Sequence, residues 1–143
     1  MTASVTFEQK HNKVTVQELL MRTRKFSLDM IFMFKALPKT VEAQVIGKQL
    51  LRSATSVTAN YRAACRGRST REFIAKLTIV VEEADESLMW LEMLEDAKIC
   101  TDQEITRLKQ EARELLFIFS ASRKSAKINL GNKLKSTNQQ IKK

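Results

Sequence analysis

Apolar residues return every three to four positions along most of the chain, as they do on the buried face of an amphipathic α-helix. Four such stripes follow one another from Val16 to about residue 126, and each has its own start and stop signals. Pro38 cannot continue a helix and ends the first stripe, while a turn at residues 66–69 separates the second from the third. The pattern predicts helices over about 16–36, 41–66, 70–96 and 102–126.

Three of these helices are preceded by a capping-box pattern, in which Ser or Thr is followed three residues later by Glu. The pairs are Thr15 with Glu18, Ser69 with Glu72, and Thr101 with Glu104. Gly47 lies inside the second helix, where an unneeded glycine costs about 1 kcal/mol, and it therefore predicts a close contact between helices. Gly67 follows the second helix and suits a left-handed residue at its end.

The low content of turn-forming residues favours long helices, since the 143 residues include only three glycines and one proline. Helices joined by loops of about three to four residues fold back on one another in turn. We therefore predict an all-α, up-down-up-down antiparallel four-helix bundle over residues 15–126. Residues 1–14 are expected to form a flexible N-terminal arm, and residues 127–143 a basic, disordered C-terminal tail.

The formal net charge of +9 is unevenly placed, because residues 123–143 contain seven basic residues and no acidic one. Antiparallel packing would bring the end of the second helix, the start of the third and the end of the fourth together. Bases gathered there are expected to bind phosphates, since clustered Lys and Arg release counterions from nucleic acid. The expected nucleic-acid-binding residues are Arg62, Arg66, Arg68, Arg71, Lys76, Arg123, Lys124 and Lys127.

The uneven charge also fits two interpretations that involve no nucleic acid. The helix macrodipole favours cations at the C-terminal ends of the second and fourth helices, so part of the cluster could be a solvated surface. The macrodipole does not account for Arg71, or for the acidic end of the third helix, and these charges also fit a protein partner or a neighbouring subunit. Trp90 lies off the main stripe of the third helix, so it either widens the core contact or anchors a subunit interface. We favour the interface, with Glu86 beside it.

The sequence lacks the residues that most enzymes and metal sites require. Its single histidine, His11, lies in the N-terminal arm, so a Glu-x-x-His motif for a di-metal site and a histidine base for a nucleophile are both missing. No phosphate-binding glycine loop occurs, and we predict neither an enzyme nor a metal or other cofactor. Apolar runs far shorter than the roughly 20 residues that cross a bilayer, together with two cysteines, fit a cytoplasmic protein.

Residues 50–94 carry the most distinctive motifs. These are a Ser-x-x-Ser-x-x-x-Asn run at Ser53, Ser56 and Asn60, the helix start Ser69-x-x-Glu72-Phe73, the segment Glu83-Ala84-x-Glu86, and the pair Trp90-Leu91. In these features the chain resembles the four-helix-bundle proteins of the 23S rRNA intervening-sequence family. The resemblance extends more faintly through the first and fourth helices.

The resemblance implies a bacterial, cytoplasmic bundle protein that forms ring-like homo-oligomers, pentamers among them. Related accessory proteins of diversity-generating retroelements are basic bundles thought to engage nucleic acid and a reverse transcriptase. Many relatives have an acidic residue after the Asn of the motif, whereas Arg62 and Ala63 stand in that neighbourhood here, which makes this chain more basic. We predict a non-enzymatic homo-oligomer that binds RNA or DNA non-specifically. The alternative is an oligomeric assembly or adaptor module with no nucleic-acid role.

Overall fold

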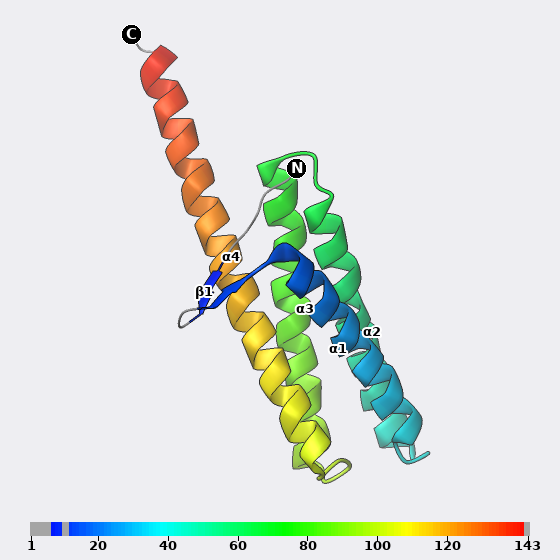
Figure 1. Cartoon of the computed structure of the whole chain (residues 1–143). Helices are drawn as coiled ribbons and strands as arrows, with labels where there is room; N and C mark the ends of the chain where they lie inside the picture. Colours follow the sequence, from blue (N-terminus) through cyan, green and yellow to red (C-terminus); the bar gives the residue numbers. More distant parts are fainter. Residues whose placement is uncertain (1–6, 10–11, 142–143) are drawn as a thin grey trace.

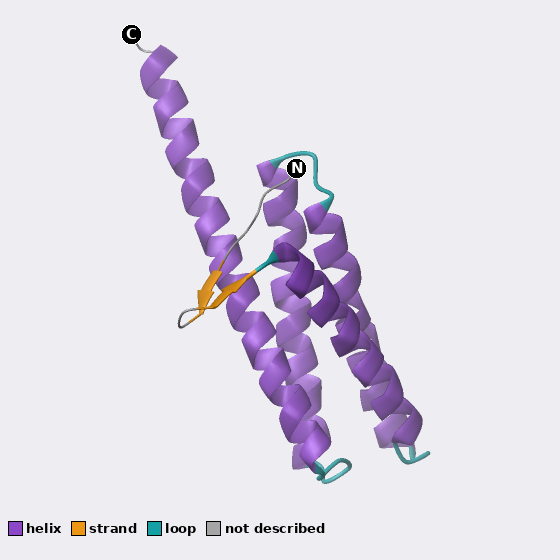
Figure 2. Cartoon of the chain, in the orientation of Figure 1, coloured by secondary structure: helices purple, strands orange, loops and turns teal. Residues whose placement is uncertain are grey.

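Four long helices alternate in direction and pack along most of their length (Figure 1). The computed structural model describes residues 7–9 and 12–141. The helices are α1 (Val16–Ala36), α2 (Val41–Cys65), α3 (Thr70–Asp96) and α4 (Gln103–Ile141). Two short strands, β1 (Phe7–Gln9) and β2 (Asn12–Val14), precede them and form an antiparallel pair (Figure 2). The predicted all-α four-helix bundle is confirmed.

Hydrogen bonds between side chains and backbone fix the relative direction of α1 and α2. The Thr58 hydroxyl donates to the Thr23 carbonyl oxygen at 2.7 Å. The Ser27 hydroxyl donates to the Ala54 carbonyl oxygen at 3.0 Å. Ser27 lies one turn after Thr23 in α1, and Ala54 lies one turn before Thr58 in α2. The two helices are therefore antiparallel, and each of these hydroxyl groups donates to a carbonyl oxygen of the neighbouring helix.

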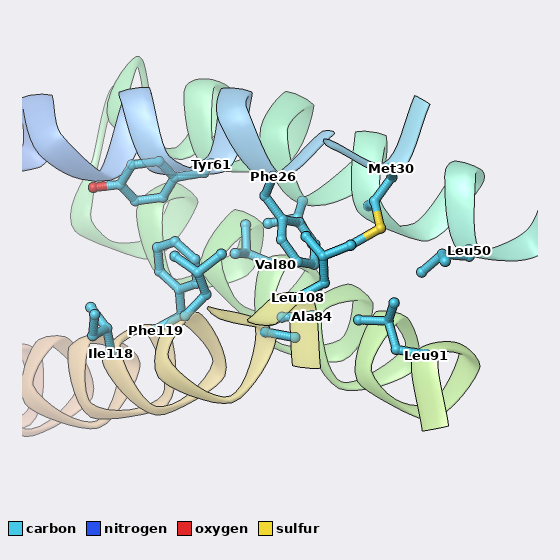
Figure 3. Close-up of a cluster of buried hydrophobic side chains, with 14 of the residues drawn as sticks. Phe26, Met30, Leu50, Tyr61, Val80, Ala84, Leu91, Leu108, Ile118 and Phe119 are labelled. Atoms are coloured by element: carbon cyan, nitrogen blue, oxygen red, sulfur yellow. The ribbon is translucent and has the colours of Figure 1, made fainter. Parts of the chain in front are cut away.

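The apolar stripes of all four helices meet in one core, and Figure 3 shows their side chains converging between the ribbons. Burying a large apolar side chain contributes about 1.5–3 kcal/mol relative to leaving it exposed, so this core is the main source of stability. Fully buried side chains come from each helix: Phe26 and Met30 from α1, Val57 from α2, Leu77 and Leu91 from α3, and Leu108 and Phe119 from α4.

Gly47 allows α1 and α2 to approach each other near their connecting turn. A Cβ atom at this position would lie 2.5 Å from Leu37 Cδ1 and 2.9 Å from Phe34 Cδ2. Both distances are shorter than an ordinary van der Waals contact, so a larger residue would displace these two side chains. The predicted close contact at Gly47 is confirmed.

The predicted N-caps of α1 and α3 are confirmed. Thr15 and Glu18 form a complete capping box, in which each side chain accepts from the backbone amide of the other residue. The Ser69 hydroxyl accepts from the Glu72 amide at 3.1 Å. The Glu72 carboxylate accepts from the amide of Arg68 at 2.9 Å, one residue before the position that a capping box specifies.

The start of α4 differs from the prediction. Asp102, rather than Thr101, accepts a hydrogen bond from the backbone amide of Ile105 at 3.3 Å. Asp is at least as good an N-cap as Thr, which explains the shift by one residue. Glu104 is held in an ion pair with Arg107 and does not complete a capping box.

The left-handed residue predicted at Gly67 occurs elsewhere, since no described glycine has a positive φ. A Cβ at Gly67 would lie 3.1 Å from the Ala64 carbonyl oxygen, so this glycine relieves crowding in the turn. Lys98 takes the left-handed conformation after α3, with φ 57°. Its amide donates to the Glu95 carbonyl oxygen at 2.9 Å, and the Ile99 amide donates to the Leu94 carbonyl oxygen at 2.9 Å. This is the Schellman motif, a common way for a helix to end.

The prediction of a disordered tail is wrong for residues 127–141. α4 is 39 residues long and continues as a helix to Ile141, beyond its last buried residue, Ser122. This segment projects past the α2–α3 turn (Figure 1). Leu130, Leu134 and Ile141 keep the spacing of the core stripe, although polar residues surround them and obscure the pattern. Residues 142–143 lie outside the described part.

The predicted flexible arm, residues 1–14, contains the two strands. Phe7 pairs with Val14, and Val14 is 7 % exposed and joins the core cluster. Part of this segment is therefore attached to the bundle, in contrast to the prediction of a loose arm. Residues 1–6 and 10–11 lie outside the described residues, so the prediction is not tested there.

Candidate nucleic-acid interface

Side chains of α2 and α4 that meet across the core place the predicted basic residues at one end of the bundle. The rings of Tyr61 in α2 and Phe119 in α4 lie 4.9 Å apart, centroid to centroid. Arg62 follows Tyr61 directly, and Arg123 lies one turn beyond Phe119. The α2–α3 turn closes the same end of the bundle (Figure 1). Alternating helix direction thus brings together bases that are far apart in the sequence.

We call the eight predicted residues the basic end, and they form two groups within it. One group surrounds the α2–α3 turn and the first turns of α3, and the other lies on α4. The turn group is Arg62, Arg66, Arg68, Arg71 and Lys76, and the α4 group is Arg123, Lys124 and Lys127. Lys76 and Arg123 are half-buried and the other six are exposed.

None of the eight basic side chains is paired with a carboxylate among the side chains that the structure describes. Every ion pair within 4.0 Å in this part of the chain involves other residues. Glu72 is the nearest acid in the sequence, and one oxygen of its carboxylate accepts from the backbone amide of Arg68 rather than from a basic side chain. The positive charge of the basic end is therefore not neutralised by these side chains and is available to an anion.

Three arginines elsewhere in the bundle are each paired with two carboxylates, whereas Arg24 and Arg113 have no described ion pair. Arg22 on α1 binds Glu111 and Glu114 on α4, the latter at 2.9 Å. The same arrangement recurs twice: Arg52 binds Glu83 and Glu86, and Arg107 binds Asp29 and Glu104. Hydrogen bonding to Glu111 raises the pKa of Arg22, and hydrogen bonding to Glu104 raises the pKa of Arg107. The basic end thus differs from these three paired sites.

Glu86, predicted at an oligomer interface, pairs with Arg52 of the same chain. Burial acts to raise the pKa of Glu86, but hydrogen bonds to Arg52 and Glu83 outweigh it and hold the pKa below its usual range. Burial raises the pKa of Glu83, and the nearby Glu86 adds to this effect, although Arg52 opposes it. The Glu86 carboxylate therefore has a structural partner, which leaves less of its charge for another subunit.

Trp90, predicted at the same interface, is half-buried and packs against the core. Its Nε1 is fully buried and makes no hydrogen bond of ordinary geometry within the described part of the chain, although Trp90 is near enough to Glu86 to help lower the pKa of that carboxyl. A buried donor without an acceptor carries a desolvation cost. The contact with the core accounts for one of the two roles considered for Trp90, and its interface role stays a prediction.

The motif residues Ser53, Ser56 and Asn60 serve helix packing and local structure. Ser53 is fully buried, and the Ser87 hydroxyl of α3 donates to it at 2.9 Å. The Asn60 side-chain amide donates to both the carbonyl oxygen and the hydroxyl of Ser56, each at 2.9 Å. Small hydroxyl residues let α2 and α3 pack closely while satisfying their own polar groups. Sequence reasoning missed these contacts, although Ser53 lies next to Ala54 of the core stripe.

The remaining polar residues bear on two kinds of chemistry, metal binding and the reactivity of thiols. Within residues 14–141, no three His, Cys, Asp or Glu side chains lie close enough together to hold a metal ion. Cys65 and Cys100 are half-buried free thiols, and burial raises the pKa of both, with Asp102 adding to the effect at Cys100. They are protonated at neutral pH and are poor nucleophiles. None of the described helices has a stretch long and apolar enough to span a bilayer.

Comparison with known proteins agrees with the architecture and with the motifs. A family model described as "23S rRNA-intervening sequence protein" matches residues 17–121. A crystal structure of a protein of unknown function from the S23 ribosomal protein family of Bacteroides thetaiotaomicron VPI-5482 superposes with a TM-score of 0.71 and 28% sequence identity. The match covers 76% of this chain and 97% of that one. No curated protein matches the chain. The chain belongs to the 23S rRNA-intervening sequence protein family.

Proposed function

We propose that this chain is a non-enzymatic, homo-oligomeric bundle protein of the bacterial cytoplasm that binds RNA or DNA without sequence preference. The observation that carries the proposal is the contrast in charge pairing. Eight basic side chains gather at one end without a described carboxylate partner, whereas Arg22, Arg52 and Arg107 each bind two. A phosphate backbone offers the repeated negative charge that such a surface fits.

The backbone adds to the positive potential of the basic end. The N-terminus of α3 lies there, and the partial positive charge of its amide groups favours anions. Arg68 and Arg71 flank this N-terminus. The opposite dipole, at the C-terminus of α2, is offset by Arg62 and Arg66. Long, flexible basic side chains suit contacts to phosphates, which position a protein but carry no sequence information.

The proposal is tested by Arg66→Glu combined with Arg68→Glu, with Lys35→Glu combined with Lys39→Glu as the matched control. Both double variants change the net charge equally, and all four side chains are exposed, but Lys35 and Lys39 lie at the opposite end. Binding is measured by fluorescence anisotropy with a short DNA duplex and a single-stranded RNA at about 50 mM salt.

We expect the variant at the basic end to weaken binding at least about tenfold, since two phosphate contacts are lost and two repulsive charges are added. The control should bind within about twofold of wild type, apart from a small effect of total charge. Equal weakening in both variants would show that net charge alone drives the interaction. Unchanged binding in Arg66→Glu with Arg68→Glu would exclude the basic end as the site.

A second candidate function is an assembly or adaptor module without a nucleic-acid role. The observation that favours it is the partly covered Trp90 with its unsatisfied Nε1. Large aromatic side chains often carry much of the energy of an interface. Sedimentation of wild type and of Trp90→Ala at micromolar concentration tests this function. Loss of an oligomer in the variant supports it, and a monomer in both proteins contradicts it.

A further inference from the structure

The end of α4 presents an apolar stripe that its own bundle does not cover. We call residues 127–141 the overhang, a helix of about 22 Å at 1.5 Å per residue. Leu130, Leu134 and Ile141 continue the stripe that Phe119 and Ala126 begin inside the bundle. Leu134 is 44% exposed and Ile141 is 76% exposed. The face that binds the core in the first part of α4 is therefore uncovered in the last part.

The overhang has little to stabilise it within one chain. All of its side chains are exposed or half-buried, and no atom lies within 4 Å of the Cβ position at Gly131. Glycine and the several Asn, Ser and Thr residues here are weak helix formers, and isolated helices shorter than about 12–15 residues are marginal in water. A surface that covers the apolar stripe would supply the missing burial.

The outer face of α3 has the composition and length of such a surface. We call it the acidic face, and its members are exposed: Glu82, Asp85, Met89, Glu92, Met93 and Asp96. Their spacing of three to four residues places them on one side of the helix. None of the four acids takes part in an ion pair with a described side chain. The acidic face and the overhang are each 15 residues long.

The charges of these two surfaces are complementary. The overhang carries Lys127, Lys133 and Lys135 beside its apolar stripe and has no acidic residue. Two overhangs packed on each other would bring like charges together, whereas the acidic face offers opposite charge around two exposed methionines. Methionine adapts well to irregular apolar contacts. The overhang projects away from α3 of its own chain, so the contact requires a second molecule (Figure 1).

We propose that the overhang of one chain packs its apolar stripe on the acidic face of a second copy. The two partners would use different surfaces, so the contact is heterologous and each copy can both give and receive an overhang. This contact specifies the homo-oligomer and therefore rests on the proposed function. It uses neither Arg66 nor Arg68 and can be measured without nucleic acid, so its failure is distinct from failure of nucleic-acid binding.

Two disabling variants and one control test the contact by sedimentation velocity at high micromolar concentration. The overhang variant is Leu130→Asp with Leu134→Asp, and the face variant is Met89→Lys with Met93→Lys. The control is Asn129→Asp with Asn132→Asp, which adds the same charge on the side of the overhang away from its apolar stripe. All six side chains are exposed or half-buried, and circular dichroism checks that each bundle stays folded.

We expect wild type and the control to sediment as oligomers, and each disabling variant alone to be monomeric. A mixture of the two disabling variants should form dimers and no larger species. Only the face variant has an intact overhang and only the overhang variant has an intact acidic face, so each pair can make one contact. A monomeric wild type, or oligomers in either disabling variant, would overturn the proposal. A mixture that stays monomeric while wild type assembles would also overturn it, since the overhang and acidic face would then not meet.

Discussion

Arg22 and Arg52 along the bundle and Arg66 and Arg68 at its basic end have the same chemistry and opposite surroundings. Arg22 and Arg52 are each fixed between two carboxylates of a neighbouring helix, whereas Arg66 and Arg68 have no described carboxylate partner. Paired arginines contribute to the packing of helices, and their charge is already balanced. Unpaired arginines add little to the fold, and the clustering of several at one end fits the proposed phosphate ligand. The contrast separates arginines that join helices from arginines that fit the proposed binding.

The largest effect is expected from the aromatic contact that positions α4 at the basic end. Phe119→Ala removes a fully buried ring that packs on Tyr61, and such truncations cost about 3–5 kcal/mol. Chemical denaturation measures the change in the free energy of unfolding. Phe117→Ala is the matched control, because Phe117 is 62% exposed and its loss should cost less than about 0.5 kcal/mol. Similar costs for the two changes would contradict the observed packing.

The next effect distinguishes the two kinds of arginine directly. Arg22→Ala leaves Glu111 and Glu114 without their partner, and we expect a loss of about 1–2 kcal/mol. Arg62→Ala removes an exposed side chain that has no described ion pair, so its effect should stay within about 0.5 kcal/mol. Thermal unfolding of both variants checks the difference. A loss of stability in Arg62→Ala as large as in Arg22→Ala would mean that the basic end is structural.

A smaller effect is expected for the hydroxyl contact between α2 and α3. Ser53→Ala removes the acceptor of the 2.9 Å hydrogen bond from Ser87, and it should cost about 0.5–1 kcal/mol. Ser87 keeps its second bond, to the Glu83 carbonyl oxygen at 2.8 Å, which limits the loss. The change in the free energy of unfolding is compared with that of Ser56→Ala, a half-buried residue of the same motif. If Ser53→Ala stabilises the protein, the motif does not contribute to packing in the way described.

The smallest effect depends on pH. Hydrogen bonding to Arg107 lowers the pKa of Glu104 in the folded state. A lowered pKa stabilises the fold at pH values above the unfolded pKa of about 4.3, and this contribution disappears as the pH falls through the lower folded value. Glu104 is largely exposed, so Glu104→Gln should cost only a few tenths of a kcal/mol at neutral pH. The unfolding curves of Glu104→Gln and of wild type should converge in acid. A difference in stability that grows in acid would contradict the lowered pKa of Glu104.

Local signals in the sequence were sufficient for the helices and for the end at which the bases gather. Spacing of apolar residues, Pro38 and the Thr15 and Ser69 caps depend on neighbours within one or two turns, and they predicted the bundle correctly. The start of α4 was missed because Thr101 and Asp102 are both good caps, and only the observed Ile105 contact selects between them.

The features that the sequence did not predict depend on distant partners. The pairing of Arg22 with Glu111 joins residues 89 positions apart, and nothing near either residue marks the other. The overhang was predicted as disordered because its polar residues outweighed three well-spaced apolar ones. Whether a base is paired or unpaired requires the packed structure, and that distinction now supports the candidate site.

The most direct test of the central claim is the salt dependence of duplex binding by wild type. Each phosphate contact contributes about 0.9 to the slope of log K against log salt concentration, so use of most of the eight bases predicts a slope of about −4 to −7. Fluorescence anisotropy between about 50 and 200 mM salt covers the range in which such binding falls steeply. A slope in the predicted range would support phosphate binding at the basic end. Absence of binding at the lowest salt, or an affinity that does not change with salt, would contradict it.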